Sequence, residues 1–148
     1  MELYKISPVR QSEKMMFIKH AIDYFTELNE NFVPIQEFKN EYFESIKKAK
    51  QLYLVWLLYK NEKVGFSIYG IEKHRFLNKK IGKIYDFYIF RNKRRNDLGN
   101  YFSKLIISEL KRKKIEKIEL EVIINNKIAF QFWKKQSFKE YSIKFYLK

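Results

Sequence analysis

Cysteine is absent from this chain of 148 residues. Disulfide bonds, thiolate metal sites and a cysteine acyl-enzyme are therefore excluded. The two histidines, His20 and His74, form no metal-ligand pattern with Asp or Glu, so we expect no metal site. Long apolar runs are also missing, and the first twenty residues carry Glu2 and Glu13, which argues against a signal peptide or membrane span. We expect a cytoplasmic protein, since a chain without cysteine is compatible with a reducing compartment.

Acidic residues are scarce relative to basic ones, and the formal net charge is +14. A basic surface favours nucleic acid through counterion release, and 27 aromatic residues could stack on bases. We regard nucleic-acid binding as the weaker hypothesis, because most basic residues are lysine and the aromatic residues fall at core-like spacing. The charge is also unevenly distributed: residues 23–44 sum to −5 and residues 72–95 to +7. Such a layout suits an anionic ligand in one place and a cationic ligand in another.

No repeat, low-complexity tract or linker interrupts the chain, and its length and apolar content suit a single domain spanning residues 1–148. Apolar spacing predicts helices and strands in alternation. We predict strands at 2–6, 51–59, 64–71, 83–90, 117–123 and 141–147, and helices at 12–29, 34–49, 97–113 and 126–135. Ser12 is the predicted N-cap of the first helix, Pro34 lies in the first turn of the second, and a hairpin turn is expected at residues 61–63.

The segment from Arg94 to Gly99 lies where an aromatic-rich strand ends and an amphipathic helix begins. A helix start presents backbone N–H groups without intrahelical partners and the positive end of the macrodipole. Arginine adds bidentate phosphate contacts, and Gly99 lets a ligand approach the backbone closely. The junction is therefore a predicted phosphate-binding site.

Two sequence blocks give the chain a resemblance to the GNAT superfamily of N-acetyltransferases. The family's Arg/Gln-x-x-Gly-x-Gly/Ala signature resembles residues 94–99, which follow a strand at residues 86–89. A second family block, with Asn, Ala, a hydrophobic-Tyr pair and Gly-Phe, is similar to Asn126, Ala129, Phe132-Trp133 and Ser137-Phe138. The resemblance implies an α/β (α+β) fold with a mixed, mostly antiparallel sheet of about six or seven strands and about four helices.

The resemblance also implies a function, the transfer of an acetyl group from acetyl-CoA to a primary amine by direct attack. The implied cofactor-binding residues are Tyr88, Ile89, Arg94, Arg95, Asn96, Asp97, Leu98, Gly99, Asn100, Asn126, Phe130 and Trp133. Among them, the Ile89 backbone N–H would polarise the thioester carbonyl, and Asn126 would bind the pantetheine arm. Ordinary core packing is an equal alternative for Phe130 and Trp133.

Three positions depart from the family pattern. Asp97 replaces the first glycine and places a carboxylate near the pyrophosphate, unless its side chain turns away to cap the helix, which we favour. Trp133 replaces a tyrosine that protonates the leaving thiolate in many relatives, and an indole cannot act as that acid. Ser137 replaces a turn glycine, which we interpret as a structural variation.

Two residues are the catalytic candidates. Attack by an amine requires its deprotonated form, and Asp86 is the predicted general base because it lies just before the phosphate loop. A purely structural pairing with a nearby cation is an equal alternative for Asp86. Tyr141, or else Tyr146, is the candidate acid.

The acceptor is left open by the sequence. The acidic stretch 23–44 favours a cationic small molecule or peptide amine, such as a polyamine, an aminoglycoside, a peptide N-terminus or a lysine side chain, although a solvated helix face explains it as well. The oligomeric state is left open as well, although the β-rich C-terminal segment could pair across a homodimer. A degenerate relative that binds CoA or acyl-CoA without catalysis is the main alternative function.

Overall fold

The computed structural model describes residues 2–94 and 96–148. Its sheet has five strands, which are β1 (Tyr4–Pro8), β2 (Leu52–Tyr59), β3 (Glu62–Lys73), β4 (Lys80–Ile89) and β5 (Lys117–Leu120). The helices are α1 (Lys14–Leu28), α2 (Gln36–Lys48), α3 (Leu98–Lys111) and α4 (Lys127–Lys135), with short 3-10 turns at Gln11–Glu13 and Arg91–Lys93. The predicted mixed, mostly antiparallel sheet flanked by four helices is confirmed.

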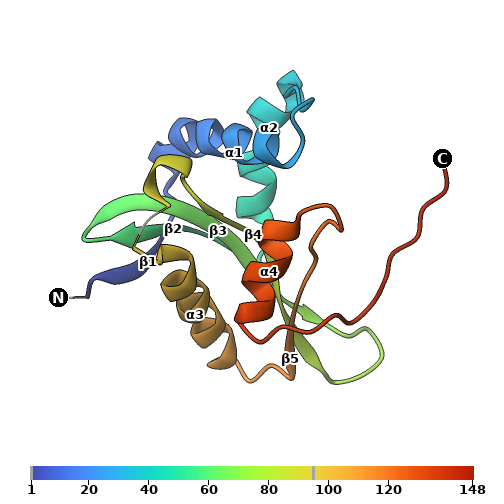
Figure 1. Ribbon diagram of the computed structural model, residues 1–148. Coiled ribbons are helices and arrows are strands. Elements are labelled where there is room, and N and C mark those ends of the chain that lie inside the picture. The colour runs from blue at the N-terminus through green and yellow to red at the C-terminus, as the bar shows by residue number, and fades with distance from the viewer. Residues whose placement is uncertain (1, 95) are drawn as a thin grey trace.

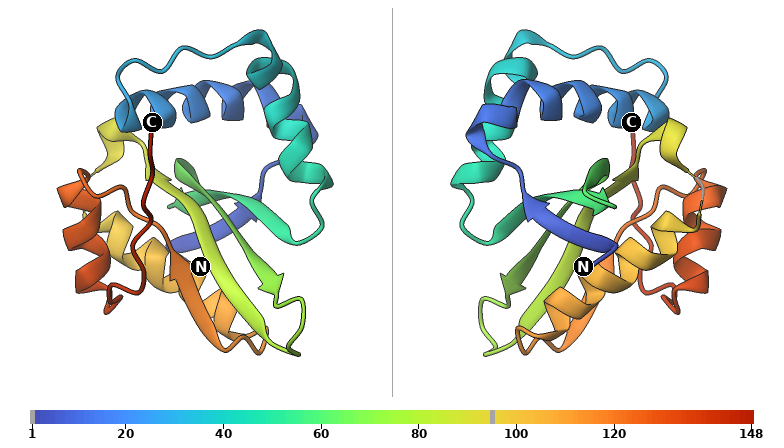
Figure 2. Two further views of the ribbon diagram at one scale, coloured as in Figure 1. Left: turned by 90° about the vertical axis from the view of Figure 1, so that its right-hand side faces the viewer. Right: turned by 90° about the vertical axis from the view of Figure 1, so that its left-hand side faces the viewer.

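The strands lie in the order β1-β2-β3-β4-β5. The first four are antiparallel neighbours, and β5 pairs parallel to β4. Helices α1 and α2 cover one face of the sheet, and α3 and α4 lie on the other (Figure 1; Figure 2). Strand residues alternate between the two faces, so the sheet separates two apolar cores.

Each core is built around aromatic side chains. On the α1/α2 side, the Phe17 ring packs edge-to-face on Phe66 at 5.1 Å and on Trp56 at 6.3 Å between ring centroids. On the other side, the fully buried Phe102 and Ile106 of α3 pack against the sheet. These buried rings explain why so many of the aromatic residues follow helical or strand spacing.

The strand count of about six or seven was wrong, because the described residues form five strands. Residues 141–147 alternate as predicted but form no strand, since no backbone hydrogen bond joins this segment to another described residue. Alternation alone does not create a strand without a neighbour to complete the ladder. The strand at 117–123 is also shorter than predicted, because its pairing with β4 ends at Leu120.

Several element ends differ from the prediction. Glu13, not Ser12, is the N-cap of α1, because residues 11–13 form a 3-10 turn. Helix α2 begins two residues after Pro34. The β2–β3 turn consists of Lys60 and Asn61, which both have positive φ, so β3 already begins at Glu62.

Candidate functional site

The candidate site begins where β4 and β5 separate. The two strands pair over only four residues, from Ile81 opposite Lys117 to Ile84 opposite Leu120. A β-bulge at Tyr85 follows at once on β4, since Ile68 pairs with Asp86 and Tyr69 with Ile84. A bulge bends its strand and increases its twist. Beyond Ile84, β4 therefore continues with no partner strand on its β5 side among the described residues.

The free edge of β4 carries the Ile89 N–H. Backbone groups of an antiparallel strand alternate between its two edges. The Phe90 N–H donates to the Val64 carbonyl of β3 at 2.8 Å, so the Ile89 N–H points the other way, away from β3. This orientation agrees with the predicted role of Ile89 as a carbonyl-polarising donor.

Asp86 lies on β4 with its side chain on the α1/α2 side of the sheet, among aromatic rings. Burial raises the pKa of this carboxyl above its usual value, although a hydrogen bond donated by the Tyr24 hydroxyl opposes that shift. Burial also raises the pKa of Tyr24 and of Tyr42, and the nearby Asp86 charge adds to both shifts. The fold thus holds a carboxyl group partly out of water, with the Tyr24 hydroxyl as its hydrogen-bond donor.

The loop before α3 has a left-handed backbone. Asn96 and Asp97 have φ values of 61° and 58°, and α3 begins at Leu98. Asp97 occupies the N-cap position, but its side chain accepts no backbone hydrogen bond, so the predicted capping role was wrong. N-cap side chains reach the first turn from an extended backbone, which Asp97 lacks. Its carboxylate instead accepts from the Asn100 side-chain amide at 3.1 Å.

The first turn of α3 therefore keeps its N–H groups free of a side-chain cap. Four N–H groups at a helix start have no intrahelical acceptor, and together with the macrodipole they attract anions. Gly99 contributes by packing: a Cβ there would lie 3.1 Å from the Phe132 ring of α4. The absence of a side chain brings α3 and α4 together, a different role from the close ligand approach that we predicted. Arg95 lies outside the described residues.

Arg94 is held on the α1 side of this loop. Its Nε donates to the Ile89 carbonyl at 2.9 Å, and its guanidinium pairs with Glu27 of α1 at 2.8 Å. The guanidinium also lies over the Tyr88 ring, 5.3 Å from its centroid, and the Tyr88 hydroxyl donates to Glu27. Burial and the contact with Glu27 raise the pKa of Tyr88 above its usual value. Tyr88 and Arg94 therefore join α1 to the loop.

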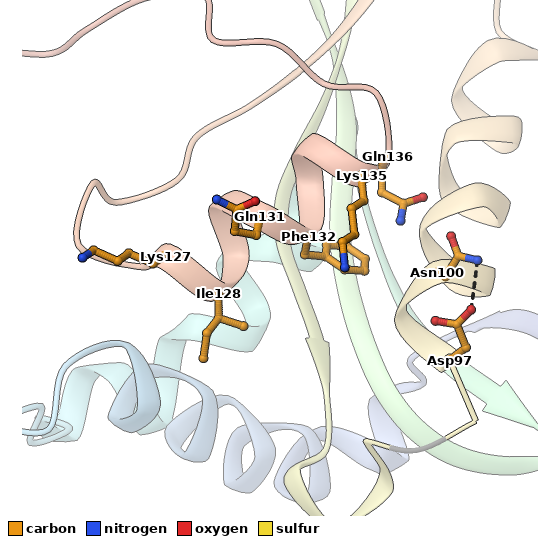
Figure 3. A pocket seen from close by; sticks show the side chains of 8 residues that line it. All are labelled: Asp97, Asn100, Lys127, Ile128, Gln131, Phe132, Lys135 and Gln136. Carbon is orange, nitrogen blue, oxygen red and sulfur yellow. Dashed lines mark hydrogen bonds between the residues drawn. The ribbon is translucent and has the colours of Figure 1, made fainter.

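A groove lies between the start of α3 and α4 (Figure 3). It encloses about 680 Å³, and Asp97 and Asn100 line its α3 side. The residues from α4 and its end are Lys127, Ile128, Gln131, Phe132, Lys135 and Gln136. Two lysines at one groove give it positive charge, which the Asp97 carboxylate partly offsets.

Three other predicted cofactor residues lie on or beside α4. Asn126 caps the helix, because its Oδ1 accepts the Ala129 N–H at 3.1 Å. Trp133 is buried and packs edge-to-face on Phe87 and Phe138, each at 5.4 Å. Phe130 is 37% exposed with Lys134 over its ring. Trp133 therefore packs in the core, which was the alternative to cofactor binding. Asn126 has a structural role as the N-cap of α4.

The predicted acid lies apart from this group of residues. Tyr141 accepts a hydrogen bond from Lys117 at 2.8 Å, and Lys117 pairs with Ile81 at the start of β5. Asp86 lies five residues further along β4, about 17 Å at the usual strand rise. The structure thus brings together Asp86, Tyr88, Ile89 and Arg94, and it leaves Tyr141 at the far end of β5.

Sequence reasoning missed Glu27 and Tyr24 as individual site residues. Both contacts join α1 to β4 or its loop, more than 60 residues along the chain, so spacing could not reveal them. The groove lysines could have been found: Lys127, Gln131 and Lys135 recur every four residues and share one exposed helix face.

Comparison with known proteins gives a consistent picture. A family model described as the acetyltransferase (GNAT) family matches residues 16–138. A solved structure of a possible acetyltransferase from Clostridium difficile 630 is similar at a TM-score of 0.83 and 16% identity, covering 99% of this chain and 97% of that one. An aminoglycoside acetyltransferase, meta-AAC0020 from an uncultured soil metagenomic sample, solved with sisomicin, has a TM-score of 0.75 and 17% identity over 99% of this chain and 96% of that one. No curated protein matches. In the part of the chain that the structure describes, no helix is long and apolar enough to cross a membrane.

Proposed function

The chain belongs to the GNAT family of acetyltransferases, and from this premise we propose that it transfers an acetyl group from acetyl-CoA to a primary amine. One observation carries the proposal: β4 leaves its partner strand with a free edge that runs directly to the uncapped start of α3. A free strand edge binds an extended amide-containing arm, and a helix start binds phosphate. Acetyl-CoA contains both groups in sequence.

The residues present suit the three parts of this co-substrate. The N–H groups of the first turn of α3 would bind the pyrophosphate, and the free edge of β4, with the Ile89 N–H, would bind the pantetheine arm and the thioester carbonyl. Lys127 and Lys135 of the groove would bind the remaining phosphate of the nucleotide. When bound, acetyl-CoA supplies an activated acyl group.

Asp86 would accept the proton from the acceptor. A lysine-like amine has a pKa of about 10.4, so removing its proton at pH 7 costs roughly 4–5 kcal/mol. A carboxyl whose pKa is raised by burial accepts that proton more readily than an exposed one. The amine nitrogen then attacks the thioester carbon and forms the C–N bond, the C–S bond breaks, the thiolate leaves, and the nitrogen gives up its second proton to water. A thiol pKa of about 8–9 allows water to protonate that thiolate, so the step does not depend on Tyr141, whose role as acid stays a prediction.

A cationic acceptor is supported by the charge on α1. Asp23 is a neighbour that raises the pKa of Tyr88, two residues after Asp86, and it adds to the charge of Glu27, which Arg94 offsets. Aminoglycosides and polyamines carry several amines and suit such a surface, and one neighbouring fold is that of an aminoglycoside acetyltransferase. Nucleic acid is a weaker candidate for the binding partner. A cytoplasmic location of the protein stays a prediction.

A CoA-binding module without catalysis is the second candidate function. Asp97 favours it, because its carboxylate lines the groove that the nucleotide would enter. At about 4 Å and an effective dielectric near 20, a like-charge pair costs on the order of 4 kcal/mol. The Asn100 side-chain amide donates a hydrogen bond to the Asp97 carboxylate and offsets part of its negative charge.

Calorimetric titration with acetyl-CoA and with dephospho-CoA tests the proposal. We expect micromolar acetyl-CoA binding and about 10-fold weaker dephospho-CoA binding, because one charged phosphate contact is lost. In a Lys127→Ala, Lys135→Ala variant the two ligands should bind alike, whereas Lys39→Ala, Lys48→Ala on α2 should preserve the difference.

An amine panel then separates the two candidate functions. Release of CoA with a polyamine or an aminoglycoside supports the enzyme, whereas tight binding without turnover supports the module. Failure to bind acetyl-CoA at millimolar concentration would overturn both.

A further inference from the structure

The β3–β4 hairpin ends in a loop of six residues, 74–79, that projects from the end of the sheet opposite α1 and α2 (Figure 1; Figure 2). One histidine holds this loop in shape. The His74 N–H donates to the Lys79 carbonyl at 2.9 Å, and His74 Nδ1 accepts the N–H groups of Phe76 and Leu77, each at 3.2 Å. The loop therefore presents its tip in a defined conformation.

Two adjacent apolar side chains form the apex of this tip. Phe76 is 80% exposed and Leu77 is 52% exposed. The Arg75 guanidinium lies over the Phe76 ring, 5.3 Å from its centroid, and neither apolar residue belongs to one of the two cores. An apolar apex with a charged rim is typical of a surface that binds a partner or a membrane.

Four cations flank the apex in the sequence. Lys79 pairs with Glu116 at 3.5 Å. The other three, Lys73, Arg75 and Lys80, have no ion-pair partner among the residues that the structure describes. The end of the hairpin therefore carries an excess of positive charge.

Two of these cations lie directly opposite each other, because Lys73 and Lys80 are the last pair of the β3–β4 ladder. Like charges at opposite positions destabilise a strand pair, and a bound anion would relieve their repulsion. A hollow of about 600 Å³ is lined by both lysines, and the carboxylate in its lining, Glu72, pairs with Lys83 at 3.5 Å. Two ammonium groups at one hollow suit an oxyanion such as phosphate.

We propose that the end of the β3–β4 hairpin binds an anionic lipid surface. Phe76 and Leu77 enter the headgroup region, and Lys73 and Lys80 bind the phosphate of a lipid headgroup. Apolar side chains and a neighbouring cluster of basic residues bind anionic lipids together, and binding of this kind needs no membrane-spanning helix.

The shape of the tip favours lipid over other partners. Single-stranded nucleic acid binds a basic groove with several aromatic rings in a row, whereas this projecting tip offers one exposed phenyl ring, that of Phe76. A second copy of the chain would bring the same cations together. Lipid headgroups move apart around a projecting side chain and present phosphates throughout the surface.

Lipid binding at this tip leaves the proposed acetyl-transfer site open. Ile89 lies nine residues beyond Lys80 on β4, about 30 Å away at the usual strand rise. Lipid binding does not depend on acetyl transfer, so it is measured without acetyl-CoA.

Co-sedimentation of the full chain with vesicles is the first test. We expect binding to vesicles of phosphatidylcholine mixed with phosphatidylserine, and little binding to phosphatidylcholine alone, at physiological ionic strength. Phe76→Ser, Leu77→Ser should weaken binding about 10-fold or more, with an unchanged circular dichroism spectrum because both side chains are exposed. Val33→Ser, Ile35→Ser is the matched control: these apolar residues before α2 are 78% and 61% exposed, and the variant should bind as the wild type does.

Charge variants test the lysine pair. Lys73→Gln, Lys80→Gln should weaken vesicle binding about 5-fold per lysine. It should also raise Tm, because it removes a like-charge pair from the ladder. Lys39→Gln, Lys48→Gln on α2 removes the same net charge far from the tip and should change the binding constant by less than about 2-fold.

Tryptophan fluorescence reports whether the tip enters the headgroup region. Trp56 and Trp133 are buried, so Phe76→Trp adds an exposed indole whose emission should shift to the blue with anionic vesicles. No binding to anionic vesicles, binding that survives Phe76→Ser, Leu77→Ser, or an emission that does not shift would each overturn the proposal. Binding to a single-stranded oligonucleotide without binding to vesicles would overturn it as well.

Discussion

At the scale of single residues, Asp86 is a carboxyl group whose burial opposes its ionisation. The fold raises its pKa by burial, and the Tyr24 hydroxyl is the polar group that opposes the shift. A carboxyl whose folded pKa exceeds its unfolded value stabilises the fold below the unfolded pKa, and this stability is lost as pH rises through the folded pKa. Ionisation of this carboxyl therefore costs stability. A functional group is a common reason to retain such a cost.

We predict that Asp86→Asn raises the free energy of unfolding at pH 7 by on the order of 1 kcal/mol, or roughly 2–4 °C in Tm. The neutral amide still accepts the Tyr24 hydrogen bond and removes the buried charge. Thermal melts at several pH values should show the advantage shrinking as pH falls toward about 4 and lost below it, where aspartate is protonated in both the folded and the unfolded chain. Acetyl transfer at pH 7 should fall about 10²–10⁴-fold, as expected on loss of a general base. A variant that is stabilised but fully active would leave Asp86 without a catalytic role.

At the scale of elements, the contact between α1 and the loop after β4 is the feature that connects the two sides of the sheet. Glu27 accepts hydrogen bonds from Tyr88 and Arg94, so one carboxylate of α1 holds the strand end and the loop together. It also adds a negative charge beside the predicted pyrophosphate site. The same carboxylate neutralises Arg94, which is a predicted phosphate-binding residue. The exposed ion pair itself contributes only about 0–1 kcal/mol.

Glu27→Gln should therefore tighten acetyl-CoA binding by about 2–5-fold, since 1.4 kcal/mol corresponds to a factor of ten. The amide keeps a hydrogen-bond acceptor for Tyr88 but releases the Arg94 charge toward the ligand. Calorimetry on Glu30→Gln, a loss of the same charge near the end of α1, gives the control and should show no change. Weaker binding in Glu27→Gln would mean that the ion pair positions the loop for the ligand rather than competing with it.

The same elements show what the sequence predicts and what it does not. Apolar spacing located α3 and α4 within two residues, because each buries one continuous stripe. Alternation at residues 141–147 was equally regular, yet it yielded no strand, since a strand needs a partner that local pattern does not supply. The loop motif located Asp97 but not its left-handed backbone, which decides where its carboxylate points. Contacts such as Glu27 with Arg94 depend on the packing of distant segments and have no local signature.

For the whole molecule, response to acid depends on carboxylates of opposite behaviour. Glu13 connects the start of α1 to the β2–β3 hairpin: it accepts from the Arg10 backbone N–H at 2.9 Å and pairs with Lys63 at 2.9 Å. Burial alone would raise its pKa, but these two partners outweigh burial and lower the pKa to about 2. A lowered pKa means stability that is present above the unfolded value of 4.5 and lost as pH falls toward 2. The raised pKa of Asp86 shifts stability in the other direction, at pH values above the ordinary 3.8 of that carboxyl.

We expect the effect of Glu13 to exceed that of Asp86, so that acid destabilises the fold. Protonation of Glu13 breaks its ion pair with the hairpin. The net charge of +14 at pH 7 also rises further as pH falls, which increases repulsion within the chain. Glu13→Gln should lower the free energy of unfolding at pH 7 by on the order of 1–2 kcal/mol, a figure discounted because water screens the partly exposed Lys63. Chemical denaturation from pH 7 to pH 2.5 should show the wild type converging on the variant as Glu13 takes up its proton. Glu41 is an exposed residue of α2, and Glu41→Gln is the control: its free energy of unfolding should follow that of the wild type at every pH. If the free energies of unfolding of Glu13→Gln and wild type differed by the same amount at every pH, Glu13 would act by packing. Acid sensitivity would then arise from charge repulsion over the whole molecule.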